Sequence, residues 1–169
     1  PAFTITNGID QEKFFPAPER RVARRVLALS RKKAADLATI MEIVKDHNIE
    51  FKVVDKLTQS QLIEEYQQAD VFLATGYPEG LPLPPLEAMN CGCAVVGFTG
   101  GGAREYMIDH ETALVAEDGD CATAAEKLLE LLNNPHLKET IRANGTAIAR
   151  SYTLENTKQQ IAEFYASFN

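Results

Sequence analysis

Five short apolar runs recur along the chain, separated by longer stretches of helical period. Within each run the apolar positions are nearly continuous and do not alternate with polar ones. That pattern is typical of strands that helices cover on both faces, as in a parallel sheet. The five predicted strands are residues 26–29, 51–54, 71–75, 94–98 and 113–116.

The stretches between these runs carry apolar residues at helical spacing. We predict helices over residues 34–45, 59–68 and 86–90. Asp120 is placed to cap a further helix, whose apolar positions recur every three or four residues until Asn133-Asn134-Pro135 ends it. Strands that alternate with helices predict an α/β fold, a Rossmann-like doubly wound parallel sheet of about five strands with helices on both faces.

A helical tail closes the chain. Thr153 can cap a terminal helix over residues 153–169, and its apolar stripe consists of Ile161, Phe164, Tyr165 and Phe168. We expect a stripe of this size to dock, either on this domain or on one that the sequence lacks. Residues 1–16 form an entry segment before the first strand, so residues 1–169 are expected to make one domain.

Composition narrows the classes of function. A chain of 169 residues with 45% hydrophobic content suits one compact domain. The formal net charge of -7 argues against nucleic acid as a partner, because such binding draws its affinity from clustered cations. Basic residues gather between positions 20 and 33, where we expect either a solvated charged face or a site for one small anion.

Cysteine usage and the chain ends bear on location. The three cysteines lack paired metal-ligand spacing, which fits a reducing cytoplasm. No apolar run approaches the ~20 residues that a bilayer crossing needs, and no signal segment opens the chain. We therefore expect a cytoplasmic protein. The first residue is Pro1 and not an initiator Met, which favours a domain excised from something longer.

Candidate chemistry lies just after the predicted strands, because an open parallel sheet binds ligands beyond the carboxyl ends of its strands. Residues 30–33, 76–87 and 99–102 occupy that edge. No Gly-x-Gly-x-x-Gly follows the first strand, so a dinucleotide cofactor is not expected. No histidine has a visible Ser or Cys partner, which makes a hydrolase triad improbable.

The middle segment holds two carboxylates, Glu79 in a Gly/Pro loop and Glu87 after the helix start Pro84-Pro85. We expect this helix start to aim free amides and a positive helix end into the crevice, which suits a phosphate or diphosphate. A purely structural explanation stays open for both. Glu87 can be an acid placed favourably in a first helical turn, and Glu79 a solvated loop acid.

The residues of this segment resemble a known motif. Residues 79–92 resemble that of glycosyltransferase family 4, which reads Glu-Gly-Phe-Gly-Leu-Pro-x-Leu-Glu-Ala-Met followed by a Gly. Further segments resemble the same family, namely residues 7–10, 70–73, 101–106 and 111–115. The resemblance implies a retaining group 1 enzyme of the GT-B fold, of which this chain is the carboxyl-terminal half that binds the nucleotide-sugar donor.

The resemblance also implies roles for residues of the motif. Glu79 matches the acid beside the hydroxyls of the transferred sugar and is the candidate catalytic residue. Glu87 matches the acid that holds the ribose of the nucleotide. Backbone amides around the sugar and phosphates would come from Gly80, Leu81 and Leu83.

The phosphates would be neutralised by basic side chains. Arg31 matches an arginine with that role, and Lys33 or Lys32 stands for its partner lysine. Two such cations stabilise charge on a leaving diphosphate, work done elsewhere by a metal, so neither metal nor other cofactor is expected. Gly101, in a run of three glycines, can approach a phosphate through bare backbone or simply shape the turn.

The chain also departs from the family pattern. Pro82 stands where the motif has its second Gly, the basic segment is compressed into residues 31–33, and one strand-helix unit after the first helix is absent. Three alternatives follow: a nucleotide-sugar-binding or regulatory module of the same fold that has lost transfer, a nucleotide-sugar epimerase, and a flavodoxin-like signalling domain. The spacing of the two glutamates disfavours the second, and a basic segment after the first strand disfavours the third.

The expected function is transfer of a sugar, with retention, from a nucleoside diphosphate to an unknown acceptor. We expect the acceptor to lie on a missing amino-terminal domain, so the isolated chain is expected to be inactive or nearly so. Any peripheral association with a membrane would come only through that missing half.

Overall fold

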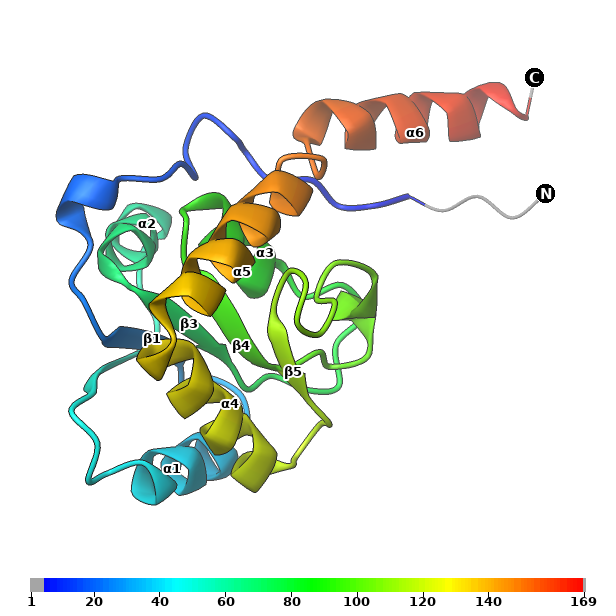
Figure 1. Cartoon of the computed structure of the whole chain (residues 1–169). Helices are drawn as coiled ribbons and strands as arrows, with labels where there is room; N and C mark the ends of the chain where they lie inside the picture. The colour runs from blue at the N-terminus through cyan, green and yellow to red at the C-terminus, as the bar shows by residue number, and fades with distance from the viewer. Residues whose placement is uncertain (1–4, 169) are drawn as a thin grey trace.

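Five parallel strands form one sheet in the order β2-β1-β3-β4-β5 (Figure 1). The computed structural model describes residues 5–168. The strands are β1 (Arg25–Leu29), β2 (Glu50–Val54), β3 (Val71–Ala74), β4 (Ala94–Phe98) and β5 (Leu114–Ala116). All five predicted strands are confirmed, with ends that shift by at most one residue. The expected end residues 1–4 and 169 lie outside the described residues.

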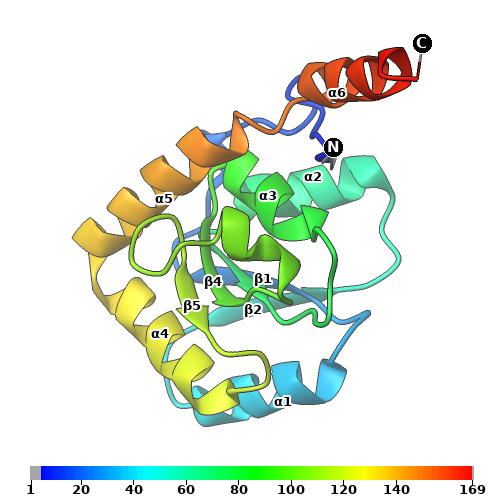
Figure 2. The same ribbon diagram turned by 90° about the vertical axis from the view of Figure 1, so that its right-hand side faces the viewer.

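Residues 5–168 also form six helices and two short 3-10 helices. They are α1 (Ala34–Ile43), α2 (Gln59–Gln68), α3 (Leu83–Asn90), α4 (Cys121–Asn133), α5 (Pro135–Ala149), α6 (Leu154–Ala166), η1 (Pro18–Arg20) and η2 (Gly102–Glu105). Figure 2 shows α1 and α4 on one face of the sheet and α2 and α3 on the other. The predicted doubly wound architecture is therefore confirmed.

Adjacent residues of each strand enter opposite cores. Leu27 and Phe72 pack with residues of α2 and α3 on one face. Val26 and Val71 pack with residues of α1 and α4 on the other face. Because both of their faces are buried, β1, β3, β4 and β5 read as continuous apolar runs in the sequence. The edge strand β2 differs, since it exposes Glu50, Lys52 and Val53.

Helix starts follow the capping residues that the sequence offers. The side chain of Asp120 accepts a hydrogen bond from the Thr123 amide, and that of Thr153 accepts one from the Asn156 amide. The α3 helix begins at Leu83, three residues earlier than predicted, because proline fits the first turn of a helix. The helix that ends at Asn133 is followed at once by α5, which begins at Pro135.

The apolar stripe of the terminal helix α6 is not buried against the sheet. None of its residues is buried, and Tyr165 and Phe168 are 67% and 72% exposed. Its polar contacts reach the entry segment: the Thr6 amide donates to Gln160 Oε1 (2.8 Å), and Thr157 Oγ1 donates to the Thr6 carbonyl (2.7 Å). Docking on another domain stays a prediction for the stripe.

A buried ion network joins the start of β3 to α5. Asp70, 3% exposed, accepts hydrogen bonds from Lys138 Nζ (2.7 Å), Arg142 Nη2 (2.5 Å) and the Arg24 amide (3.0 Å). Arg142 also donates to the Gly92 carbonyl, just after α3. Burial raises the pKa of Asp70, but the hydrogen bond from Lys138 and the other contacts outweigh it and hold that pKa below the usual value.

We predict that Asp70→Asn lowers the free energy of unfolding by about 3 kcal/mol at pH 7, because it removes the buried anion between two mostly buried cations. Of its ion pairs within residues 5–168, Arg142 then keeps only the one with the exposed Glu139. A depressed carboxyl pKa stabilises the fold above the unfolded-state value of about 4 and loses that effect as the pH falls below it. The difference between wild type and variant should therefore shrink below about pH 4. Urea denaturation at several pH values measures it.

Asp46→Asn is the matched control, because Asp46 is exposed. A loss of less than about 0.5 kcal/mol in Asp70→Asn, the range of ordinary surface substitutions, would contradict this account of the network.

Candidate functional site

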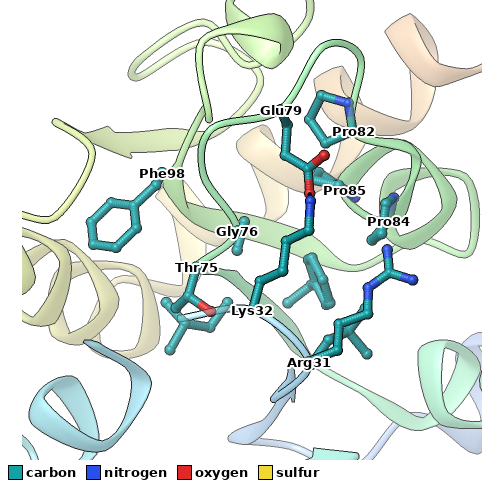
Figure 3. A pocket seen from close by; sticks show the side chains of 13 residues that line it. Arg31, Lys32, Thr75, Gly76, Glu79, Pro82, Pro84, Pro85 and Phe98 are labelled. Atoms are coloured by element: carbon teal, nitrogen blue, oxygen red, sulfur yellow. Dashed lines mark hydrogen bonds and ion pairs between the residues drawn. The ribbon is translucent and has the colours of Figure 1, made fainter. Parts of the chain in front are cut away.

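The strand order places a crevice at the carboxyl ends of β1 and β3. The chain leaves β1 for β2 at one side and returns to pair β3 with the other side of β1. Neighbouring connections that leave a sheet in opposite directions open a crevice, where ligands bind in this class of fold. Residues that follow β1 and β3 line it, with the start of α3 as a further wall (Figure 3).

Two charged groups meet across this crevice. Lys32 Nζ lies 2.6 Å from Glu79 Oε1, and the two side chains are 46% and 22% exposed. Arg31 lines the same crevice beside Lys32 (Figure 3). Of the site residues predicted from the sequence, the structure therefore brings together Arg31, Glu79 and the alternative lysine, Lys32.

Lys33, the other candidate lysine, is not among the residues that line the crevice. It precedes α1 with a left-handed backbone (φ 53°), and its Nζ lies 4.1 Å from the centroid of the Tyr77 ring. This cation–π contact directs the charge to the ring of Tyr77. The sequence alone does not show which of the two adjacent lysines faces the crevice, because this depends on the backbone conformation just before α1.

Glu87 lies beside the crevice and is not among the residues that line it. The fully buried Tyr66 donates its hydroxyl to Glu87 Oε2 (3.1 Å). Burial raises the pKa of Glu87, opposed by this hydrogen bond and by the charge of Arg31. Glu87 is the fifth residue of α3, beyond the first turn where the helix dipole acts on charges. The expectation of a simple first-turn acid is therefore wrong.

The three glycines after β4 shape the loop that carries Glu79. The Glu79 amide donates to the Gly100 carbonyl (2.8 Å), and the Gly102 amide donates to the Glu79 carbonyl (3.1 Å). A Cβ on Gly102 would lie 1.5 Å from the Gly80 carbonyl oxygen, so only glycine allows this approach. Backbone contact between the two turns thus fixes where Glu79 stands.

Gly101 is not placed to donate its amide to a ligand. That amide already donates to Thr99 Oγ1 (3.2 Å), and the Gly100 amide donates to Asp118 Oδ1 (3.0 Å). The structure therefore favours the turn-forming explanation for this glycine run over direct phosphate binding through Gly101.

The start of α3 also differs from expectation. In an α-helix the cap residue and the first three helical residues have amides without an intrahelical partner. Here those positions are Pro82, Leu83, Pro84 and Pro85, so Leu83 alone retains an N–H. The three prolines line the crevice, whereas Gly80, Leu81 and Leu83 do not. The predicted array of free helix amides is thus reduced to one.

Two tyrosines that sequence reasoning missed hold the ends of the Glu79 loop. Tyr77 donates its hydroxyl to Asp36 Oδ2 of α1 (2.6 Å) and packs edge-on against Phe98 at a centroid distance of 5.5 Å. The buried Tyr106 donates its hydroxyl to the Pro82 carbonyl. Tyr66, the partner of Glu87, was missed as well. None carries a local signal, because each partner is distant in the sequence.

A second pocket adjoins the crevice at the carboxyl end of β2. Its lining consists of Leu29, Arg31, Val54, Asp55, Lys56, Leu57 and Leu62. Arg31 and Leu29 belong to both pockets, so one ligand can extend from one to the other.

Within residues 5–168, no three side chains of His, Cys, Asp or Glu gather where they could hold one metal ion. No helix in the same range combines the length and apolar character needed to span a bilayer.

One curated relative matches nearly the whole chain. An uncharacterized glycosyltransferase of Methanocaldococcus jannaschii is 22% identical over 188 residues, which cover 97% of this chain and 53% of that relative. The chain thus spans about half the length, or less, of the curated relatives it matches.

Solved structures share the fold. The carboxyl-terminal domain of LpcC, a group 1 glycosyltransferase of Francisella tularensis, matches with a TM-score of 0.72 at 18% identity, over 87% of this chain and 100% of that one. Anabaena HepE in complex with UDP and glucose matches with a TM-score of 0.81 at 20% identity, over 96% of this chain and 56% of that one. The family model "Glycosyl transferases group 1" matches residues 33–147. The chain therefore belongs to the group 1 glycosyltransferases and has the fold of their GT-B carboxyl-terminal domain.

Proposed function

We propose that this chain binds a nucleoside-diphosphate sugar and supplies the donor half of a retaining glycosyltransferase. The observation that carries the proposal is the arrangement of Arg31 and Lys32 opposite Glu79 in one crevice at the switch point of the sheet. Cations suited to a diphosphate and a carboxylate suited to sugar hydroxyls thus lie within reach of one ligand. Anabaena HepE, crystallised with UDP and glucose, supports this assignment through its shared fold.

Arg31 and Lys32 serve the diphosphate in this proposal. When the bond between the anomeric carbon and the diphosphate oxygen breaks, its electron pair leaves with the diphosphate. Fixed cations at that point lower the energy of the transition state more than that of the ground state. This chemistry requires no metal ion, and we propose that none takes part.

The two glutamates serve different parts of the donor. Glu79, the proposed catalytic residue, accepts hydrogen bonds from hydroxyls of the transferred sugar. Glu87, held by Tyr66, accepts those of the ribose. The base then reaches the second pocket, where Leu57 and Leu62 offer apolar contacts and Arg31 is shared with the crevice.

The acceptor belongs to a second domain in this proposal. Transfer requires donor and acceptor to be held together in one orientation, which accounts for most of the rate that such enzymes gain. We propose that an amino-terminal domain holds the acceptor, that the sugar moves with retention in the cytoplasm, and that this chain by itself transfers nothing.

One observation favours a second candidate, a domain of this fold that binds a nucleotide sugar without transferring it. Pro82, Pro84 and Pro85 remove three of the four amides that the start of α3 would otherwise present. A site with fewer fixed donors stabilises a departing diphosphate less well. Measured transfer by a two-domain protein that contains this chain decides between the two candidates.

We predict that the purified chain binds at least one of UDP, GDP and ADP with a dissociation constant between about 10 μM and 1 mM, equally well with and without EDTA. The reason is that side-chain cations carry the recognition. Isothermal titration calorimetry measures it. Failure to bind any of the three would contradict nucleotide recognition, and loss of binding in EDTA would contradict the metal-free site.

We predict that Glu87→Gln weakens binding of the same nucleoside diphosphate by about tenfold, because a charge-assisted hydrogen bond to the ribose becomes a neutral one. Glu126→Gln, an exposed change on α4, should leave the affinity unaltered. If Glu87→Gln lowers the melting temperature and leaves the affinity intact, Glu87 supports only the architecture of α3 and Tyr66.

A further inference from the structure

The phosphate side of the crevice is walled by proline rings. Pro82, Pro84 and Pro85 all line it, and none of them carries an N–H (Figure 3). A helix start without prolines would present up to four amides there. An anion that enters this crevice therefore gains little from the main chain of α3 and depends on side-chain cations.

One of those cations is already engaged. Lys32 Nζ lies 2.6 Å from Glu79 Oε1, and this is the one ion pair that either residue makes within residues 5–168. In this structure, the group proposed for the diphosphate and the group proposed for the sugar neutralise each other. The Glu79 side chain is only 22% exposed, so water compensates poorly for the loss of its partner. Breaking the ion pair therefore costs more free energy at Glu79 than at a fully solvated carboxylate.

Bare nucleoside diphosphate and intact nucleotide sugar then face different costs. The bare diphosphate takes Lys32 and leaves Glu79 without a partner, and the proline wall offers no amides to offset that loss. The intact donor takes Lys32 with its phosphates and supplies Glu79 with sugar hydroxyls. Only the second ligand satisfies both members of the ion pair.

We propose that Pro82 and Pro85, acting with the Lys32–Glu79 ion pair, make this site select the intact nucleotide sugar over the bare nucleoside diphosphate that transfer leaves behind. The inference rests on the proposed function and names the device that sets the ligand preference of that site. Once the sugar has left, Glu79 competes again for Lys32, and its return to the ion pair promotes release of the diphosphate.

Calorimetry on the full chain tests this with UDP, GDP and ADP, each compared with a nucleotide sugar of the same base (UDP-glucose, GDP-mannose, ADP-glucose). Wild type should bind one nucleotide sugar at least about tenfold more tightly than its bare diphosphate. Glu79→Gln should bind the bare diphosphate about two- to fivefold more tightly, because Lys32 is released from an exposed pair. The same variant should bind the nucleotide sugar more weakly, so the ratio of the two affinities should fall towards one.

The double variant Pro82→Gly/Pro85→Ala restores two backbone N–H groups at the start of α3. It should raise the affinity for the bare diphosphate about tenfold, and raise the affinity for the nucleotide sugar by less. Pro135→Ala, at the start of α5 and away from the crevice, is its matched control. Thermal melts check that each variant is folded. If the double variant does not fold, Glu79→Gln alone tests the proposal.

The outcomes separate the two claims. If wild type binds bare diphosphate and nucleotide sugar equally well, and Glu79→Gln leaves the bare diphosphate unchanged, the selection device is wrong and the nucleotide-binding function stands. If no form of the chain binds any of the six ligands, the proposed function falls, and the inference falls with it.

Discussion

Close backbone contact between two turns positions the Glu79 loop. The turn after β4 and the loop after β3 exchange main-chain hydrogen bonds, and at Gly102 the two backbones approach so closely that a Cβ would overlap the Gly80 carbonyl. Because β3 and β4 are neighbours in the sheet, any shift of the loop would have to move a strand end as well. Main-chain contacts therefore set the position of Glu79, and the side chain of Tyr106 extends the constraint to the start of α3.

The strongly basic stretch before and after β1 divides into structural and functional parts. The guanidinium groups of Arg24 and Arg25 make contacts within the fold. Arg24 donates hydrogen bonds to the Asn48 and Leu132 carbonyls. Arg25 forms an ion pair with Glu50 and donates a hydrogen bond to Gln68. Arg31 and Lys32 follow the strand and face the crevice. An acidic domain thereby keeps two cations at one point of its surface, which suits a small anion and not an extended polyanion.

Local patterns in the sequence predicted those features that depend on neighbouring residues. Apolar runs located the strands, and Asp120 and Thr153 marked helix starts, because periodicity and capping are local effects. The two carboxylates and Arg31 were found through their place after strands and through a family motif. The partner tyrosines Tyr66 and Tyr106 were not, because they contact Glu87 and Pro82 from 21 and 24 residues away. Nor could spacing decide between Lys32 and Lys33, since one left-handed residue at a helix start makes that choice.

The environments of the two glutamates suit two different tasks. Glu87 is held in place by a fully buried hydroxyl, and burial raises its pKa, so its position is set before any ligand arrives. A fixed acceptor of this kind suits a group bound alike in the ground and transition states, such as a ribose. Glu79 is instead paired with Lys32, whose side chain is 46% exposed. An exchangeable pair suits a carboxylate whose partner changes during the reaction, first Lys32, then the sugar, then Lys32 again. The two glutamates, eight positions apart, thus have unlike surroundings, and unlike surroundings allow one site to give two carboxylates different tasks.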